Sequence, residues 1–212
     1  MTSSGWGRNC NVPKKTSNKT ARSARRYAGV AATAIVLAAA LWQQGGVMAR
    51  SDSEAAPAHQ FQLSGKVVQV ADGDTFTLLV DRRRERIRMA SIDAPEITKD
   101  SDRPGQPMAQ ASRKALAGLI AGRQLTVLCY ERDRYERSIC DVPLEDGTTA
   151  NQRQVMRGMA WANMEGRGKF MRDPSLPGFE DKARRARTGL WSQAGQVPPW
   201  VWRYQCWKQG QC

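Results

Sequence analysis

The stretch DGDTFTLLVDRRRERIRMASIDAPE, residues 72–96, places two acidic turns at the ends of an arginine-rich segment. In its first half Phe76 and Leu78 alternate with polar residues, and in its second half Ile87 and Met89 alternate with arginine. Such a period of two residues predicts β-strands that bury one face. The stretch therefore indicates a strand pair with acidic side chains at both ends.

Comparable signals continue along the chain. Strands are expected at residues 63–70, 75–80, 84–92, 125–131 and 137–144. A first helix is expected to begin near Pro104 to Pro107 and to end at Gly122, and two more are expected at 149–162 and 178–191. Five short strands with a helix after the third predict an α+β fold, mainly a small antiparallel barrel with helices packed at its end.

The N-terminal leader predicts export. Residues 1–49 contain seven Lys or Arg and no Asp or Glu, and residues 27–42 carry no charge. That run matches the apolar core of a signal peptide and is short for a spanning helix. We therefore expect transfer across the inner membrane to the periplasm or the medium. The leader is either cleaved after the VMA segment at 47–49 or kept as an anchor through residues 27–42.

These observations divide the chain into five parts. The expected parts are a basic tail at 1–26, a signal peptide or anchor at 27–49, a linker at 50–62, the working domain at 63–192 and a Trp- and Cys-containing tail at 193–212. The formal net charge is +13, but residues 50–212 hold 26 basic and 20 acidic residues. The remaining surplus suits a polyanionic ligand without proving one.

The cysteines agree with an oxidising compartment. Beyond the leader the chain has four, Cys129, Cys140, Cys206 and Cys212, which allow three pairings. Proximity favours Cys129–Cys140, across an expected hairpin, and Cys206–Cys212. A zinc site is the competing interpretation, and no Cys-x-x-Cys pair supports it.

Residues and motifs that the sequence lacks reduce the number of possible catalytic mechanisms. His59, the single histidine, precedes the first expected strand, so mechanisms that need a histidine in the core lose support. The chain also lacks the glycine-rich motifs of nucleotide-cofactor folds. Carboxylates, arginines and a hard cation remain as the reactive groups.

The acidic turns offer a phosphate-directed site. Asp74 and Asp93 would meet at one barrel end if the first three strands are neighbours, and oxygen ligands suit Ca²⁺ or Mg²⁺. Arg88 could then present its planar fork to a phosphate, and Glu96 could orient or deprotonate a water. A salt-bridged surface is the alternative interpretation.

The same residues resemble the staphylococcal nuclease, or thermonuclease, family. The matching pieces are DGDT with Asp74, then Arg88, then IDAPE with Asp93 and Glu96, and later DRYER with Arg137. They occur in the family's order, and the resemblance extends over about residues 63–191. It implies a five-stranded OB-fold barrel with three helices and a calcium-dependent endonuclease that acts on DNA and RNA.

The resemblance also implies roles for individual residues. Asp74, Asp93 and the Ala94 carbonyl would bind one Ca²⁺ ion, and the catalytic residues would be Arg88, Glu96 and Arg137. Substrate binding is assigned to three further residues, Arg134, Tyr135 and Trp161. We expect a monomer, with the membrane as a partner only through the leader.

Some positions depart from the family pattern. Ala94 replaces a threonine, which is harmless if only the backbone oxygen is used. Glu136 replaces the glycine that normally precedes the catalytic arginine and adds a negative charge beside it. The nucleotide-contacting tyrosine pair is missing, and Trp161, Asn163 or Phe170 could substitute.

Other interpretations remain for the rest of the chain. The tail tryptophans Trp200, Trp202 and Trp207 could stack on bases, although fastening the tail to the barrel is favoured. The function could also be that of a catalytically silent OB-fold protein that only binds nucleic acid, or of a structural envelope protein. Keeping carboxylates that are prone to burial near a polyanion favours the nuclease, because a binder gains nothing from their repulsion.

Overall fold

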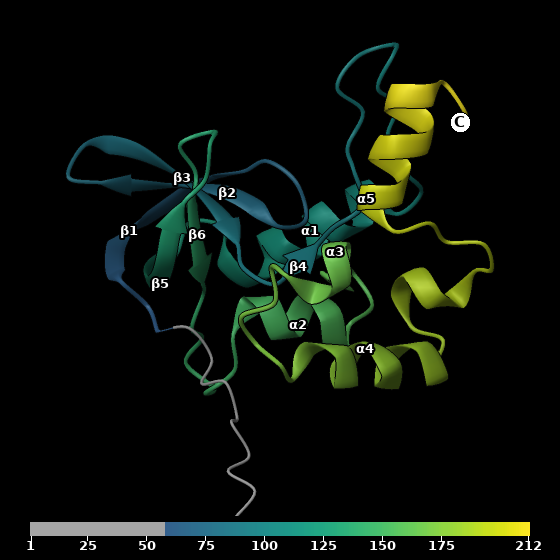
Figure 1. The fold of residues 1–212 in the computed structure, drawn as a ribbon. Coiled ribbons are helices and arrows are strands. Elements are labelled where there is room, and N and C mark those ends of the chain that lie inside the picture. The colour runs from purple at the N-terminus through teal and green to yellow at the C-terminus, as the bar shows by residue number, and fades with distance from the viewer. Residues whose placement is uncertain (1–57) are drawn as a thin grey trace, which may run out of the picture. The chain divides into compact units, whose positions relative to one another are not determined.

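The computed structural model describes residues 58–212, so the predicted leader lies outside the described residues. The strands are β1 (Phe61–Val70), β2 (Thr75–Val80), β3 (Arg83–Met89), β4 (Ile92–Asp93), β5 (Gln124–Arg132), β6 (Ser138–Asp141) and β7 (Trp161–Ala162). The helices are α1 (Ala109–Ile120), α2 (Ala150–Met156), α3 (Glu165–Gly168), α4 (Leu176–Arg185) and α5 (Pro199–Trp202), with a 3₁₀ turn η1 (Gly189–Ser192) and a π-helical segment η2 (Arg203–Lys208). Figure 1 shows the barrel strands on one side and the helices on the other.

The five long strands form a closed barrel in the order β1-β2-β3-β6-β5. All neighbours are antiparallel except β3 and β6, which pair in parallel, so the predicted barrel is confirmed with one parallel seam. The short strands β4 and β7 form a separate antiparallel pair in which Asp93 lies opposite Trp161.

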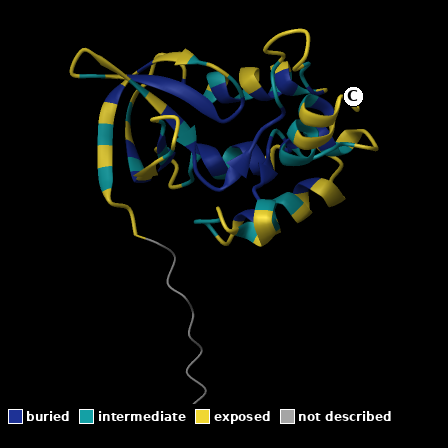
Figure 2. Ribbon diagram, turned by 45° about the horizontal axis from the view of Figure 1, so that its top comes forward, coloured by how far each residue is buried: buried dark blue, intermediate teal, exposed yellow. Residues whose placement is uncertain are grey.

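The barrel core is made by the alternation seen in the sequence. Phe76, Leu78, Ile87 and Met89 are buried, and Val127 joins them from β5. Helices α1 and α2 pack beside the barrel and close its core, with α4 against α2. Figure 2 shows the buried residues inside and the exposed residues concentrated on hairpin loops and outer helix faces.

All three predicted helices have boundaries that differ from the structure. The first helix begins only at Ala109, because Met108 adopts a left-handed conformation with φ of 66° that breaks the helix. The second ends at Met156 instead of reaching residue 162. Gly158, at φ +63°, lets the chain approach Thr188, where a Cβ would lie 2.3 Å from the carbonyl oxygen. The third, expected at 178–191, is α4 and ends at Arg185, because Arg187 adopts a left-handed conformation with φ of 51°.

Both predicted disulfides are present. Cys129 and Cys140 lie directly opposite each other on β5 and β6, and Cys206 is joined to Cys212 in the tail. Within residues 58–212, no helix is long and apolar enough to cross a bilayer.

Candidate active site

The two acidic turns of residues 72–96 meet at one end of the barrel. Asp74 lies between β1 and β2, and Asp93 ends β4. The Ala94 N–H donates a hydrogen bond of 2.6 Å to Asp74 Oδ2, and the Met89 N–H donates one of 2.8 Å to the Asp74 carbonyl. The predicted meeting of the turns is therefore observed, with backbone groups fixing it.

Arg88 on β3 lies between the two aspartates. Its Nη1 forms an ion pair with Asp74 Oδ2, and its Nη2 donates to Asp93 Oδ1 at 2.7 Å. The aspartate side chains are only 6% and 2% exposed, so their charges need a close partner. Burial alone would raise the pKa of Asp74, but the Arg88 charge and the Ala94 N–H outweigh it and lower that pKa.

Asp72 belongs to the same cluster as Asp74, Arg88 and Asp93. The sequence patterns had assigned it no role. Its Oδ1 accepts a 3.0 Å hydrogen bond from the Asp74 N–H. Burial, reinforced by the negative charge of Asp74, raises the pKa of Asp72 to about 7. The available signal was that the DGD turn carries an acid at Asp72 as well as at Asp74.

The cluster fits a hard divalent cation with few protein ligands. In residues 58–212 no three His, Cys, Asp or Glu side chains are arranged to hold a metal by themselves. Asp74 and Asp93, however, each direct one oxygen to the same guanidinium, so the two carboxylates face one shared cation. A backbone oxygen such as that of Ala94 and water would complete an all-oxygen site of the kind Ca²⁺ or Mg²⁺ prefers.

Glu96 joins the cluster through a residue from the far end of the chain. Arg203, at the start of η2, donates from Nη1 to Glu96 Oε1 at 2.7 Å. It also reaches both oxygens of Asp93, with Nη2 2.8 Å from Oδ2 and Nη1 3.2 Å from Oδ1. The sequence reasoning missed Arg203 because only the folding of the tail brings it to residues 93–96.

Arg137 lies in the turn between β5 and β6. Its Nε donates to Asp133 Oδ2 at 2.8 Å, and within residues 58–212 no ion pair joins it to the carboxylate cluster. Glu136 before it has φ of 59°, which explains why glycine suits this position. Arg134 and Tyr135 are exposed in the same turn, with Arg134 Nη2 donating to the Tyr135 hydroxyl at 2.8 Å.

The predicted substrate contact of Trp161 is not supported by its position. The side chain belongs to the core, where the residue is 1% exposed and packs edge-on against Trp191 at 5.4 Å between ring centroids. Trp161 instead helps to position Asp93, because β7, which contains Trp161, pairs with β4, which contains Asp93. Asn163, the second candidate for a substrate contact, is also buried. Phe170, the third candidate, is exposed, so burial does not prevent it from contacting a substrate.

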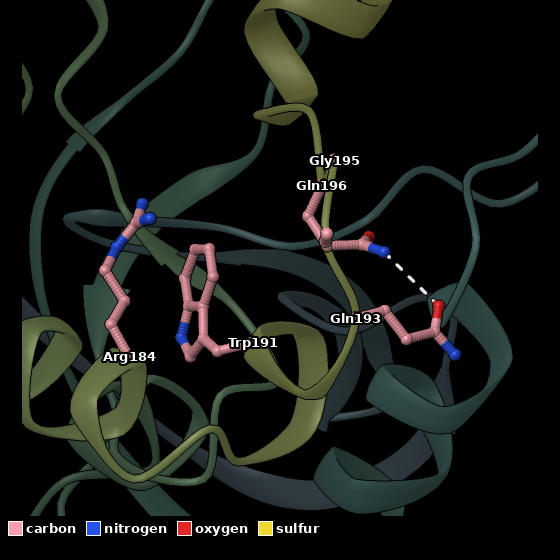
Figure 3. Close-up of a pocket in the computed structure, with 6 residues that line it drawn as sticks. Arg184, Trp191, Gln193, Gly195 and Gln196 are labelled. Atoms are coloured by element: carbon pink, nitrogen blue, oxygen red, sulfur yellow. Dashed lines mark hydrogen bonds between the residues drawn. The ribbon is translucent and has the colours of Figure 1, made fainter. Parts of the chain in front are cut away.

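A separate hollow lies at the end of α4, where Arg184 stacks on Trp191 at 3.7 Å (Figure 3). The remaining lining residues come from the segment after η1, Gln193, Ala194, Gly195 and Gln196. None of the lining residues is acidic, so this hollow offers no carboxylate for a cation or for general-base chemistry.

Comparison with known proteins gives a consistent picture. A family profile described as "Staphylococcal nuclease homologue" matches residues 86–193. A protein of Escherichia coli O157:H7 named "Uncharacterized endonuclease" is 39% identical over 143 residues, which are 68% of this chain and 86% of that protein. "Micrococcal nuclease" of Shigella flexneri is 39% identical over 147 residues, 66% of this chain and 79% of that protein. "Protein ParB" of Escherichia coli is 37% identical over 151 residues, 67% and 80% of the two chains.

Proposed function

The chain belongs to the staphylococcal nuclease family and is a hydrolytic nuclease, and from this premise we propose that it is an exported, calcium-dependent enzyme that cleaves DNA and RNA. One observation supports the proposal most directly. The buried carboxylates of Asp74 and Asp93 both pair with the guanidinium of Arg88, and Asp93 also pairs with Arg203. A divalent cation between the two carboxylates would take over the charge balance that Arg88 now supplies, and Arg88 would then turn to a phosphate.

Asp74 and Asp93, with the Ala94 carbonyl, would hold the cation. When bound, a cation here would neutralise the carboxylates and polarise a phosphate oxygen. Arg88 would then be free to present both of its nitrogens to the phosphate, because its carboxylate partners would be engaged elsewhere.

Glu96 lies at the accessible edge of the cluster, with its side chain 14% exposed. A carboxylate in this place can orient or deprotonate a water, which is the role we assign to it. Arg137, which pairs with Asp133 in the β5–β6 turn, would supply a second guanidinium to the phosphate.

The finer parts of the proposal have separate support. Export rests on the basic and apolar leader, and the two disulfides are typical of proteins that work in an oxidising compartment. Action on both DNA and RNA rests on the family resemblance and on a site that is directed at phosphate, which both polymers share.

The test is a cleavage assay on the purified chain with DNA and RNA, with calcium or with a chelator. We expect cleavage of both polymers only with calcium, with strong loss in Glu96→Gln and in Arg88→Lys, since a lysine keeps the charge but not the fork. Arg185→Ala, which removes an exposed arginine of α4, is the matched control and should retain activity. Nucleic-acid binding without cleavage under every condition would instead identify a silent binder.

A further inference from the structure

Arg203 contacts the candidate site, but the proposed function assigns it no role. Its guanidinium touches Asp93 and Glu96, the proposed cation ligand and the proposed base, at 2.7–3.2 Å. Its side chain is 29% exposed, in contrast to 13% for Arg88. Arg203 is therefore the more accessible of the two arginines at the cluster.

The backbone that carries Arg203 is fastened beside the site. Trp202 and Trp207 both donate from Nε1 to the carbonyl of Pro104, at 3.0 and 2.9 Å. Gln106 Nε2 donates to the Val197 carbonyl at 2.7 Å. Figure 1 shows the result, with the yellow C-terminal helix lying against the loop that precedes α1.

The disulfide adds to this fastening. Cys206, bonded to Cys212, is 1% exposed and closes the tail back on itself. The segment is thus held by two indole hydrogen bonds and a covalent loop, so removing it from the site would break several contacts at once. None of these fastening contacts involves the Arg203 side chain itself.

Cation binding would take from the Arg203 guanidinium one of its carboxylate partners, leaving Glu96 at 2.7 Å and Glu165 at 3.8 Å. Both oxygens of Asp93 accept from Arg203, so a cation that binds Asp93 must take over at least one of them. A guanidinium held near a cation needs an anion, and the phosphate of a bound nucleic acid is the anion that this site receives.

We propose that Arg203 is a third active-site arginine, supplied by the C-terminal segment, which binds the substrate phosphate. The inference rests on the proposed function and adds a residue to the same site. It differs from an autoinhibitory role, in which the segment would block the site and would have to leave it.

The test measures binding of a fluorescent single-stranded DNA to the purified chain with calcium, in a Glu96→Gln background that prevents turnover. Adding Arg203→Ala should weaken binding by about tenfold or more, the loss typical of one charge-assisted contact. Arg203→Lys should bind with intermediate affinity. Arg185→Ala in the same background controls for the loss of one positive charge and should change little.

The outcomes separate the possibilities. Unchanged DNA affinity in the Arg203→Ala variant would overturn the inference, and tighter binding with faster cleavage in an otherwise wild-type chain would show an inhibitory plug. If thermal melting shows that Arg203→Ala is unfolded, Arg203→Lys decides, and affinity equal to the parent overturns the inference. Failure of the wild-type chain to cleave DNA or RNA with calcium would refute the proposed function itself.

Discussion

Gly73, between the two aspartates of the DGD turn, should not tolerate a side chain. A Cβ built at this position would lie 1.8 Å from Ser112 Oγ, 2.9 Å from Ser112 Cβ and 2.7 Å from Ala94 Cβ. Nonbonded carbon atoms in contact lie about 3.5–4 Å apart. Gly73→Ala must therefore push the turn away from Ala94 by about 1 Å, given that spacing.

The size of the effect follows from this crowding. Ser112 is fully buried and its hydroxyl donates to the Met159 carbonyl at 2.6 Å, so it has little room to move. Overpacking of this kind costs about 1–3 kcal/mol of unfolding free energy. The displaced turn carries Asp74, and a shift of about 1 Å at a reacting site can reduce turnover by about a hundredfold.

Urea unfolding and the DNA cleavage rate measure the two effects. Gly118→Ala is the matched control, because its Cβ meets nothing within 4 Å and it lies inside α1. That substitution should stabilise the protein by about 0.5–1 kcal/mol and leave cleavage unchanged. A Gly73→Ala protein as stable and as active as the wild type would refute the packing argument.

Three further predictions concern stability in urea. Glu136→Gly should raise the unfolding free energy by about 0.5–1 kcal/mol, because glycine adopts a positive φ without strain; a lower value would contradict this. Replacing Cys129 and Cys140 by serine should lower it by about 3 kcal/mol under oxidising conditions, and an unchanged midpoint would show that the disulfide contributes nothing. Gln154→Leu should lower the unfolding free energy by about 1–3 kcal/mol, because it leaves the buried Gly73 carbonyl without the donor that now lies 2.8 Å away. An unchanged unfolding free energy would show that another group donates to this carbonyl.

Local patterns in the sequence were sufficient for much of the fold. Alternation at Phe76, Leu78, Ile87 and Met89 predicted which side chains are buried, because a strand with one buried face must alternate. The same patterns did not reveal the parallel pairing of β3 with β6. Alternation specifies a face, whereas the partner of a strand depends on the path of the whole chain.

The proximity of the candidate site residues was predictable where they are close in sequence. Asp74, Arg88 and Asp93 come together because adjacent strands and short turns connect them. Arg203 lies 107 residues from Glu96, and nothing in the tail's composition indicates which loop it docks on. Trp161 was predicted to contact substrate, and the structure buries it in the core; an aromatic residue can serve a core or a ligand equally well, and only packing distinguishes the two.

Calorimetric titration of calcium into the purified chain and its Asp74→Asn variant tests the central claim most directly. Asp74 contributes one of the two buried carboxylates, while Asp181 is an exposed carboxylate on α4 that serves as the control. We predict binding of one ion to the wild type and to Asp181→Asn, and loss of that binding in Asp74→Asn. Equal calcium binding by all three proteins would contradict a cation site between Asp74 and Asp93.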